Sequence, residues 1–165
     1  AAVDGRNFYY NEEFVNKLDL DETVFLVGHE VGHCVYEHFL RKGDRNPQIW
    51  NMAGDYKINA MLVREKIGRL IDKVTPLYGK KYESNDWWTE NIYDKLIEDG
   101  AAPQQTLDIH LDVEGDGDNG ASGNGSKDGK SKPTISKDDA KAISDELKNA
   151  IKIILILTFL QKKSP

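Results

Sequence analysis

The sequence predicts a predominantly helical α+β domain with a small edge sheet. Two start signals for long helices, at Asp19 and at Asn46, predict the helical part. The sheet is predicted by a β-prone segment, Arg6–Tyr10, which follows an Asp4-Gly5 turn signal. A chain of 165 residues is long enough for one domain with a hydrophobic core and short for two.

The first long helix is expected from about Asp21 to Lys42. Asp19 is the expected N-cap, and Glu22 three residues later completes the pattern of a capping box. Gly43 is the expected stop signal. Apolar residues occur on all sides of this helix, which predicts that it is buried nearly all round. They are Val24, Phe25, Leu26, Val27, Val31, Val35, Phe39 and Leu40.

A second helix is expected from Pro47 to about Lys66, because Asn46 is a favourable N-cap and proline is well tolerated at the first helical position. The segment 74–86 contains a proline and a glycine and is expected to be irregular. A third helix is expected over Trp87–Glu98, with Asn85 as a candidate cap.

The composition changes abruptly from Gly115 to Lys132 towards Gly, Asp, Asn, Ser and Lys. We therefore expect a domain at 1–112, a flexible linker or loop at 113–135, and a C-terminal helix at 136–165. The acidic residues near the start of the linker suggest calcium. However, Gly123 stands where the last EF-hand ligand belongs if Asp112 is the first, so a solvated linker is favoured.

Ser136 is the expected start of the last helix, since Asp139 three residues later completes a capping box. Apolar residues recur along this helix at helical spacing, so one face should pack against a core. They are Ile143, Leu147, Ile151 and Ile154.

Charge and cysteine content argue against several classes of protein. The formal net charge is −6, and no basic stripe with interleaved aromatic residues indicates a nucleic-acid partner. The longest apolar run, Ile153–Leu157, is far shorter than the roughly 20 residues of a membrane-spanning helix. Cys34 is the single cysteine, so no internal disulfide can form, and no signal peptide is visible. We therefore expect a cytoplasmic protein.

His29 and His33 stand four residues apart, so their side chains share one face of the expected helix and can reach one metal ion at about 2.0–2.1 Å. Glu30 points about 100° further around the helix, toward a water on the metal. Zinc lowers the pKa of such a water to roughly 7, and a carboxylate can take its proton. The spacing therefore predicts zinc-dependent hydrolysis. Buried, hydrogen-bonded histidines without a metal are the alternative.

A catalytic zinc needs a third protein ligand and one open position. Glu37 is excluded, because eight residues from His29 corresponds to about 12 Å along a helix axis. His38 is further along and is expected to point away. His110 is an alternative ligand at the edge of the polar stretch.

The second helix offers the favoured third ligand. Asn51, Asp55 and Asn59 recur every four residues and form one polar seam, flanked by apolar residues. Lys57 and Arg64 fall on the opposite face and indicate the solvent side. An inward-facing seam makes Asp55 the third ligand, with Asn59 or Asn51 supporting it one turn away. A hydrated Asn/Asp face is the alternative.

Two motifs resemble a known family. His29–His33 (HEVGH) followed by Trp50–Asn59 (WNMAGDYKIN) is similar to predicted zincin-like metallopeptidases of bacteria and phages. Asp4–Asn11 and Glu90–Leu96 look similar too, so the resemblance covers roughly residues 1–112. Members of this family usually stand ahead of a von Willebrand factor A-like domain. The terminal segment Ile153–Pro165 does not resemble their usual continuation, so the resemblance implies a truncated or altered end.

The resemblance implies a zincin-like fold in which His29, His33 and Asp55 bind zinc and Glu30 is the catalytic base. It also implies a partner domain or ATPase. The arrangement is similar to gluzincins, where a carboxylate follows the acidic ligand one turn later; here that position is Asn59.

Tyr78 and Tyr82 are candidates to contact the substrate or to donate to the developing oxyanion, and Tyr36 lies near the histidine face. A role in packing or at the rim of the site is favoured for each of them. The pair Trp87-Trp88 is expected to form core or the wall of a substrate groove. Cys34 is expected to be a buried packing residue.

The first functional hypothesis is a zinc-dependent endopeptidase acting on a protein or peptide substrate, with no nucleic-acid or membrane partner. The second is a catalytically inactive, zinc-stabilised scaffold that binds other proteins. A metal-dependent hydrolase of non-peptide amides is the third.

Overall fold

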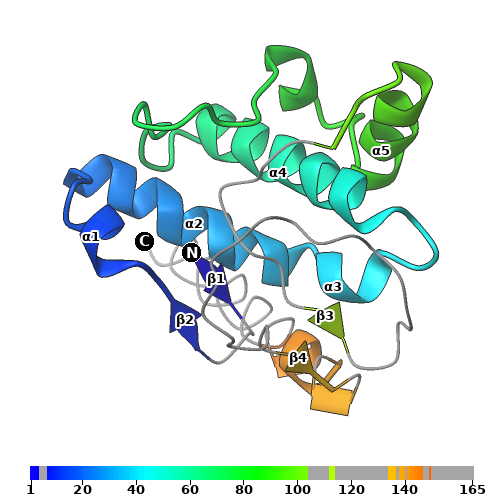
Figure 1. Cartoon of the computed structure of the whole chain (residues 1–165), viewed down its shortest axis with the longest axis horizontal. Coiled ribbons are helices and arrows are strands. Elements are labelled where there is room, and N and C mark those ends of the chain that lie inside the picture. Colours follow the sequence, from blue (N-terminus) through cyan, green and yellow to red (C-terminus); the bar gives the residue numbers. More distant parts are fainter. Residues whose placement is uncertain are drawn as a thin grey trace, which may run out of the picture.

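The computed structural model describes residues 1–3, 7–103, 112–113, 134–136, 138–139, 141–146 and 149 (Figure 1). Its elements are β1 (Ala2–Val3), β2 (Phe8–Tyr9), α1 (Glu12–Val15), α2 (Leu20–Val35), α3 (His38–Arg41), α4 (Pro47–Arg64), the 3-10 helix η1 (Lys80–Glu83), α5 (Thr89–Glu98), β3 (Asp112–Val113) and β4 (Thr134–Ile135). The prediction of a predominantly helical chain with a small sheet is confirmed.

Strands β1 and β2 pair antiparallel, with Ala2 opposite Tyr9 and Val3 opposite Phe8. The predicted strand is therefore present near the N-terminus, while the Asp4-Gly5 turn signal lies outside the described residues. A second pair, β3 with β4, runs parallel and aligns Asp112 with Thr134. The sequence indicated neither of these two strands.

Helix α2 starts as its cap predicts. The Asp19 side chain accepts from the Glu22 backbone N–H at 2.9 Å, and the Glu22 side chain accepts from that of Asp19 at 3.0 Å. The prediction of one helix running to Lys42 is wrong, because α2 ends at Val35 and a separate α3 follows. Glu37 adopts a left-handed conformation, with φ of 53°, and this interrupts the ladder of helical hydrogen bonds.

Helix α2 is buried on one side only, so the prediction of burial nearly all round is wrong. Four valines at helical spacing are 42–45% exposed, whereas Phe25 and Leu26 are at most 2% exposed. These valines are Val24, Val27, Val31 and Val35. The apolar pattern does not distinguish the two faces, because valines on the outer face look the same in the sequence as core valines.

Helix α4 is the central element, since it contacts α2 on one side and α5 and η1 on the other (Figure 1). Its predicted start is confirmed: the Asn46 side chain accepts from the N–H groups of Gln48 and Ile49 at 3.0 and 3.1 Å. Where α4 crosses α2, Gly32 allows the close approach, because a Cβ atom there would lie 2.8 Å from Ile58 Cγ2.

Two hydrophobic clusters cover the two sides of α4. The cluster toward α2 contains Phe25, Leu26, Ile58, Leu62 and Ile71. The cluster toward α5 contains Ile49, Met52, Ala53, Ala60, Leu77, Tyr82, Ile92 and Leu96. Because both clusters pack on α4, its position relative to α2 is fixed by burial from both sides.

Three expectations about the region from α4 to α5 need correction. The segment 74–86 is not wholly irregular, because it contains η1. Helix α5 begins at Thr89, and the Asn91 side chain, not that of Asn85, meets its first turn by accepting from the Trp88 N–H at 2.6 Å. Asn85 instead accepts from the Arg64 guanidinium at 2.5 Å. Asn85 therefore makes a tertiary contact with α4 and does not cap α5.

Lys57 is not on the solvent side. Its residue surface is 5% exposed, and Nζ donates to the Trp87 carbonyl at 2.5 Å while lying 5.2 Å from the Trp88 ring. Arg64 is half-buried and donates to the Glu83 carbonyl at 2.9 Å. The segment between η1 and α5 covers this face of α4, so carbonyl oxygens replace water around both cations, and aromatic rings also lie beside Lys57.

The start of the last helix has the predicted cap. The Asp139 N–H donates to the Ser136 hydroxyl at 3.0 Å, and the described residues 138–139 and 141–146 are helical. Ile143 is 5% exposed, as expected for a packed face, and the Ser144 hydroxyl donates to the Glu37 carboxylate. Leu147, Ile151, Ile154 and most of the segment 113–135 lie outside the described residues.

Among the described residues, no helix combines the length and apolar character that crossing a membrane requires. Charged side chains interrupt every long helix, as α4 illustrates with Asp55 and Lys57.

Stability should fall on acidification because of Glu22. This buried carboxylate has a pKa of about 2, below its ordinary 4.5, since Lys73 and the Asp19 N–H donate to it. Between pH 4.5 and 2 the unfolded state binds the proton more tightly, so the stabilisation present above pH 4.5 is lost as pH falls. Urea denaturation from pH 2 to 6 measures this. In Glu22→Gln the loss should be smaller, and an unchanged pH profile would contradict the assignment.

Candidate metal centre

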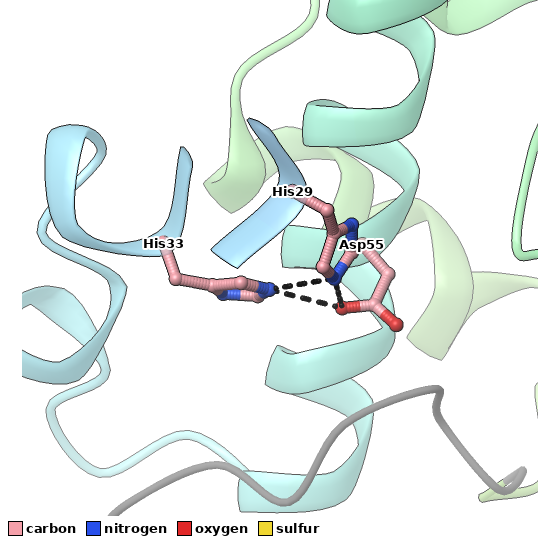
Figure 2. Close-up of side chains that lie close together, drawn as sticks. All are labelled: His29, His33 and Asp55. Atoms are coloured by element: carbon pink, nitrogen blue, oxygen red, sulfur yellow. Dashed lines mark hydrogen bonds and ion pairs between the residues drawn. The ribbon is translucent and has the colours of Figure 1, made fainter. Parts of the chain in front are cut away.

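Two elements bring three potential metal ligands together in the interior. His29 and His33 project from α2 and Asp55 from α4, and all three point toward one another (Figure 2). One ligand atom from each lies within 4.8 Å of the others. The residues are at most 4% exposed. A carboxylate and two imidazoles buried at one point need a cation or protons, because a buried charge is costly without a partner.

The separations between these atoms fit a tetrahedral metal. His33 Nε2 lies 3.1 Å from His29 Nε2. Asp55 Oδ1 lies 3.6 Å from His29 Nε2 and 3.4 Å from His33 Nε2. Ligand atoms about 2.0–2.1 Å from a tetrahedral zinc are about 3.3 Å apart, so the observed triangle has the right size. Three ligands leave the fourth position open, which is the arrangement of catalytic rather than structural sites.

Asn59 supports the first histidine. Its Oδ1 lies 2.8 Å from His29 Nδ1, and its Nδ2 donates to the Leu77 carbonyl at 3.0 Å. The bond to Leu77 identifies Oδ1 as the atom that faces the imidazole, so Nδ1 carries the proton and Nε2 is left for a metal. Asn51, the other candidate for support, is half-buried one helical turn from Asp55. The polar seam of α4 therefore faces inward at Asp55 and Asn59, as predicted.

Glu30 is 1% exposed and follows His29 directly on α2. Its side chain therefore leaves the helix about 100° from that of His29. That direction suits contact with a water near the metal rather than direct ligation. The role of general base stays a prediction for this residue.

His38 was expected to point away, and this expectation is wrong. Its Nδ1 lies 3.0 Å from His33 Nδ1, and its Nε2 lies 2.8 Å from the Thr89 hydroxyl. The left-handed Glu37 turns the chain back, so the residue after it returns to the histidine face. No signal in the sequence indicated this, because Glu is not a residue that favours a left-handed conformation.

An aromatic wall adjoins the histidines. The Tyr36 ring stacks on His38 with centroids 5.7 Å apart, and Lys57 Nζ lies 5.8 Å from the Tyr36 ring. Burial raises the pKa of the Tyr36 hydroxyl and lowers that of the Lys57 amine. Trp88 is 55% exposed, whereas Trp87 packs against the core cluster toward α5. Of the two tryptophans Trp88 is the exposed one, and its role as the wall of a substrate groove stays a prediction.

The described contacts of the remaining candidates favour packing. The Tyr78 hydroxyl donates to the Glu83 carboxylate. Tyr82 is 4% exposed, with its ring 5.0 Å from that of Trp87. Cys34 is buried, as expected, and contact of either tyrosine with an oxyanion or substrate stays a prediction. His110 lies outside the described residues.

One comparison with known protein families found a match. The sequence profile of one family, described as a putative metallopeptidase domain, matches residues 1–152. No curated protein matches the chain, and no solved structure does. The matched region contains all three clustered ligands and Glu30. Because the profile covers most of the chain, this protein belongs to the putative metallopeptidase domain family.

Proposed function

We propose that this chain is a zinc peptidase of the HExxH type, with a zincin-like fold. The observation that carries the proposal is the buried triangle of His29 Nε2, His33 Nε2 and Asp55 Oδ1, with sides of 3.1 to 3.6 Å. Two imidazoles and one carboxylate are a donor set that zinc prefers. The same residues are those implied by the resemblance to zincin-like metallopeptidases.

The charge of the donor set suits hydrolysis. Two neutral imidazoles and one carboxylate offset only half of the charge of a divalent cation. A zinc ion held there would polarise the scissile carbonyl and acidify the attacking water. A set of several thiolates or carboxylates would remove that net charge and weaken both effects.

The chain's own residues divide the remaining tasks. Glu30 accepts the proton of the attacking water and returns it to the leaving amine, which makes one carboxylate serve first as base and then as acid. His29 is held by Asn59, so its ring cannot rotate away from the site. The low exposure around the cluster excludes bulk water and strengthens every charge interaction within it.

We propose that the substrate is a protein or peptide and that the enzyme acts in the cytoplasm. By family resemblance the domain acts beside a partner domain or an ATPase. The division into a domain at 1–112, a linker at 113–135 and a C-terminal helix is retained as a proposal. An inactive zinc-stabilised scaffold would use the same three ligands, so the experiment below is designed to separate the two functions.

Digestion of a broad peptide library should give cleavage that a chelator abolishes and added zinc restores. Elemental analysis of the same preparation should show about one zinc per chain. Zinc without chelator-sensitive cleavage would favour the scaffold, and absence of any bound metal would contradict both functions. A Glu30→Gln preparation purified in parallel excludes a contaminating protease as the source of cleavage.

A further inference from the structure

We propose that His38 and Thr89 form a positioning chain that sets the tautomer and ring plane of His33. This inference rests on the proposed metal site, because it assigns a function to the side of His33 that faces away from the metal. Neither residue touches the three clustered ligand atoms; both act through His33. They are therefore positioning residues, with no direct contact to a substrate.

The hydrogen-bond directions follow from metal binding. His33 Nε2 belongs to the ligand triangle and must offer a lone pair, so the ring proton of His33 is on Nδ1. That proton points at His38 Nδ1, 3.0 Å away, which must therefore accept. His38 then carries its own proton on Nε2 and donates it to the Thr89 hydroxyl at 2.8 Å. One tautomer of each ring satisfies the whole chain.

Several contacts hold His38 in this place. The indole N–H of Trp50 donates to the His38 carbonyl at 2.8 Å, and Tyr36 stacks on the imidazole. Gly54 leaves the room for the ring, since a Cβ atom there would lie 2.8 Å from His38 Nδ1. So many constraints on one side chain, together with the left-handed Glu37 that delivers it, indicate a ring that must be placed accurately.

Helix α5 carries Thr89, the last residue of this hydrogen-bonded series, and α5 is itself held in place by an ion pair. Arg41 on α3 donates to the Glu90 carboxylate through Nε to Oε1 at 3.1 Å and through a terminal nitrogen to Oε2 at 2.5 Å. Glu90 is the neighbour of Thr89, so this bidentate pair keeps the Thr89 hydroxyl opposite His38. The second histidine is thus connected through α3 to α5, while the first is connected through Asn59 to the Leu77 carbonyl.

Both ligand histidines therefore donate their outer ring proton to a neutral acceptor. Residues that hold a ligand histidine in this way typically contribute 10–100-fold to metal affinity. The proposal predicts that removing the acceptor at His38 costs about that factor, although His38 contributes no ligand atom. It also predicts that a different side chain with an acceptor in the same place restores affinity.

Two pairs of variants test the positioning role and separate the effect of side-chain shape from that of hydrogen bonding. His38→Phe keeps a ring but cannot accept, whereas His38→Asn places an amide oxygen near the former Nδ1. Thr89→Val keeps the shape and removes the hydroxyl, whereas Thr89→Ser keeps the hydroxyl. We expect zinc affinity to fall about 10–100-fold in His38→Phe, less in Thr89→Val, and to recover in His38→Asn and Thr89→Ser.

Gly54→Ala provides an independent variant. Alanine is favoured over glycine inside a helix by about 1 kcal/mol. If the substitution acted only through helix propensity, zinc binding would therefore be unchanged. The added Cβ displaces His38, and we expect weaker zinc binding here too. Thr23→Val is the matched control. It removes the hydrogen bond from the Thr23 hydroxyl on α2 to the Asp19 carbonyl, at 2.8 Å, and Thr23 does not belong to the series His33, His38 and Thr89.

The measurements are zinc affinity by chelator competition and the visible spectrum of the Co²⁺-substituted protein, which reports ligand geometry without any activity. Wild-type protein that binds neither metal would overturn the proposed function and this inference together. Wild-type binding with equal affinity and an unchanged Co²⁺ spectrum in His38→Phe would overturn this inference alone. If circular dichroism shows that His38→Phe does not fold, comparison of Thr89→Val with Thr23→Val decides.

Discussion

Replacing Glu30 by glutamine is expected to abolish peptide hydrolysis while the protein keeps its metal. The amide has nearly the shape of the carboxylate but cannot take a proton from the attacking water. Loss of a positioned general base lowers turnover by about 10²–10⁴-fold. The side chain is 1% exposed, and the nearly isosteric amide preserves the packing around it.

The measurement is the cleavage rate of a substrate found in the library digestion, with zinc content determined on the same sample. Glu12→Gln is the matched control, since the same change there affects an exposed residue of α1. Turnover within a few-fold of wild type in Glu30→Gln, at full zinc occupancy, would remove this residue from the mechanism. The scaffold hypothesis predicts no difference between the two variants.

Asp55→Ala is expected to release the metal. Asp55 supplies the single negative charge of the donor set, and two neutral imidazoles on one helix remain without it. Loss of a coordinating ligand should exceed the 10–100-fold effect typical of a residue that only supports one. Because Asp55 comes from α4, its loss also removes the link that a bound metal would make between α2 and α4.

Elemental analysis and chelator competition measure this effect, with Asp94→Ala on the exposed side of α5 as the control. A wild-type zinc content in Asp55→Ala would show that the third ligand comes from another residue. The thermal unfolding temperature with and without zinc gives a second readout. A metal-dependent increase should be present in the control and absent in Asp55→Ala, since a ligand stabilises only the state that binds it.

The predictions that succeeded concern residues whose effect is local. The capping pairs Asp19 with Glu22 and Asn46 with Pro47 start their helices where the sequence placed them. The spacing of the two histidines on α2 likewise follows from helical geometry alone. Asp55 was found because its polar seam has a helical period and its distance along the chain permits an antiparallel return.

The predictions that failed concern residues whose neighbours are distant in sequence. Lys57 is buried because α5 covers it, and Asn85 is not a cap because it binds Arg64 on α4. The valines of the outer face of α2 are exposed although the sequence predicts them in the core, since no local signal shows which side of that helix packs.

The sequence by itself thus determined the helix starts, the shared face of the two histidines and the polar seam that carries Asp55, because each depends on periodicity and hydrogen bonds within a few residues. Only the tertiary structure decided that the chain turns at Glu37 and brings His38 behind His33. A left-handed glutamate is intrinsically unfavourable. It persists because contacts from α4 and α5, at Trp50, Gly54 and Thr89, hold the turned chain in place.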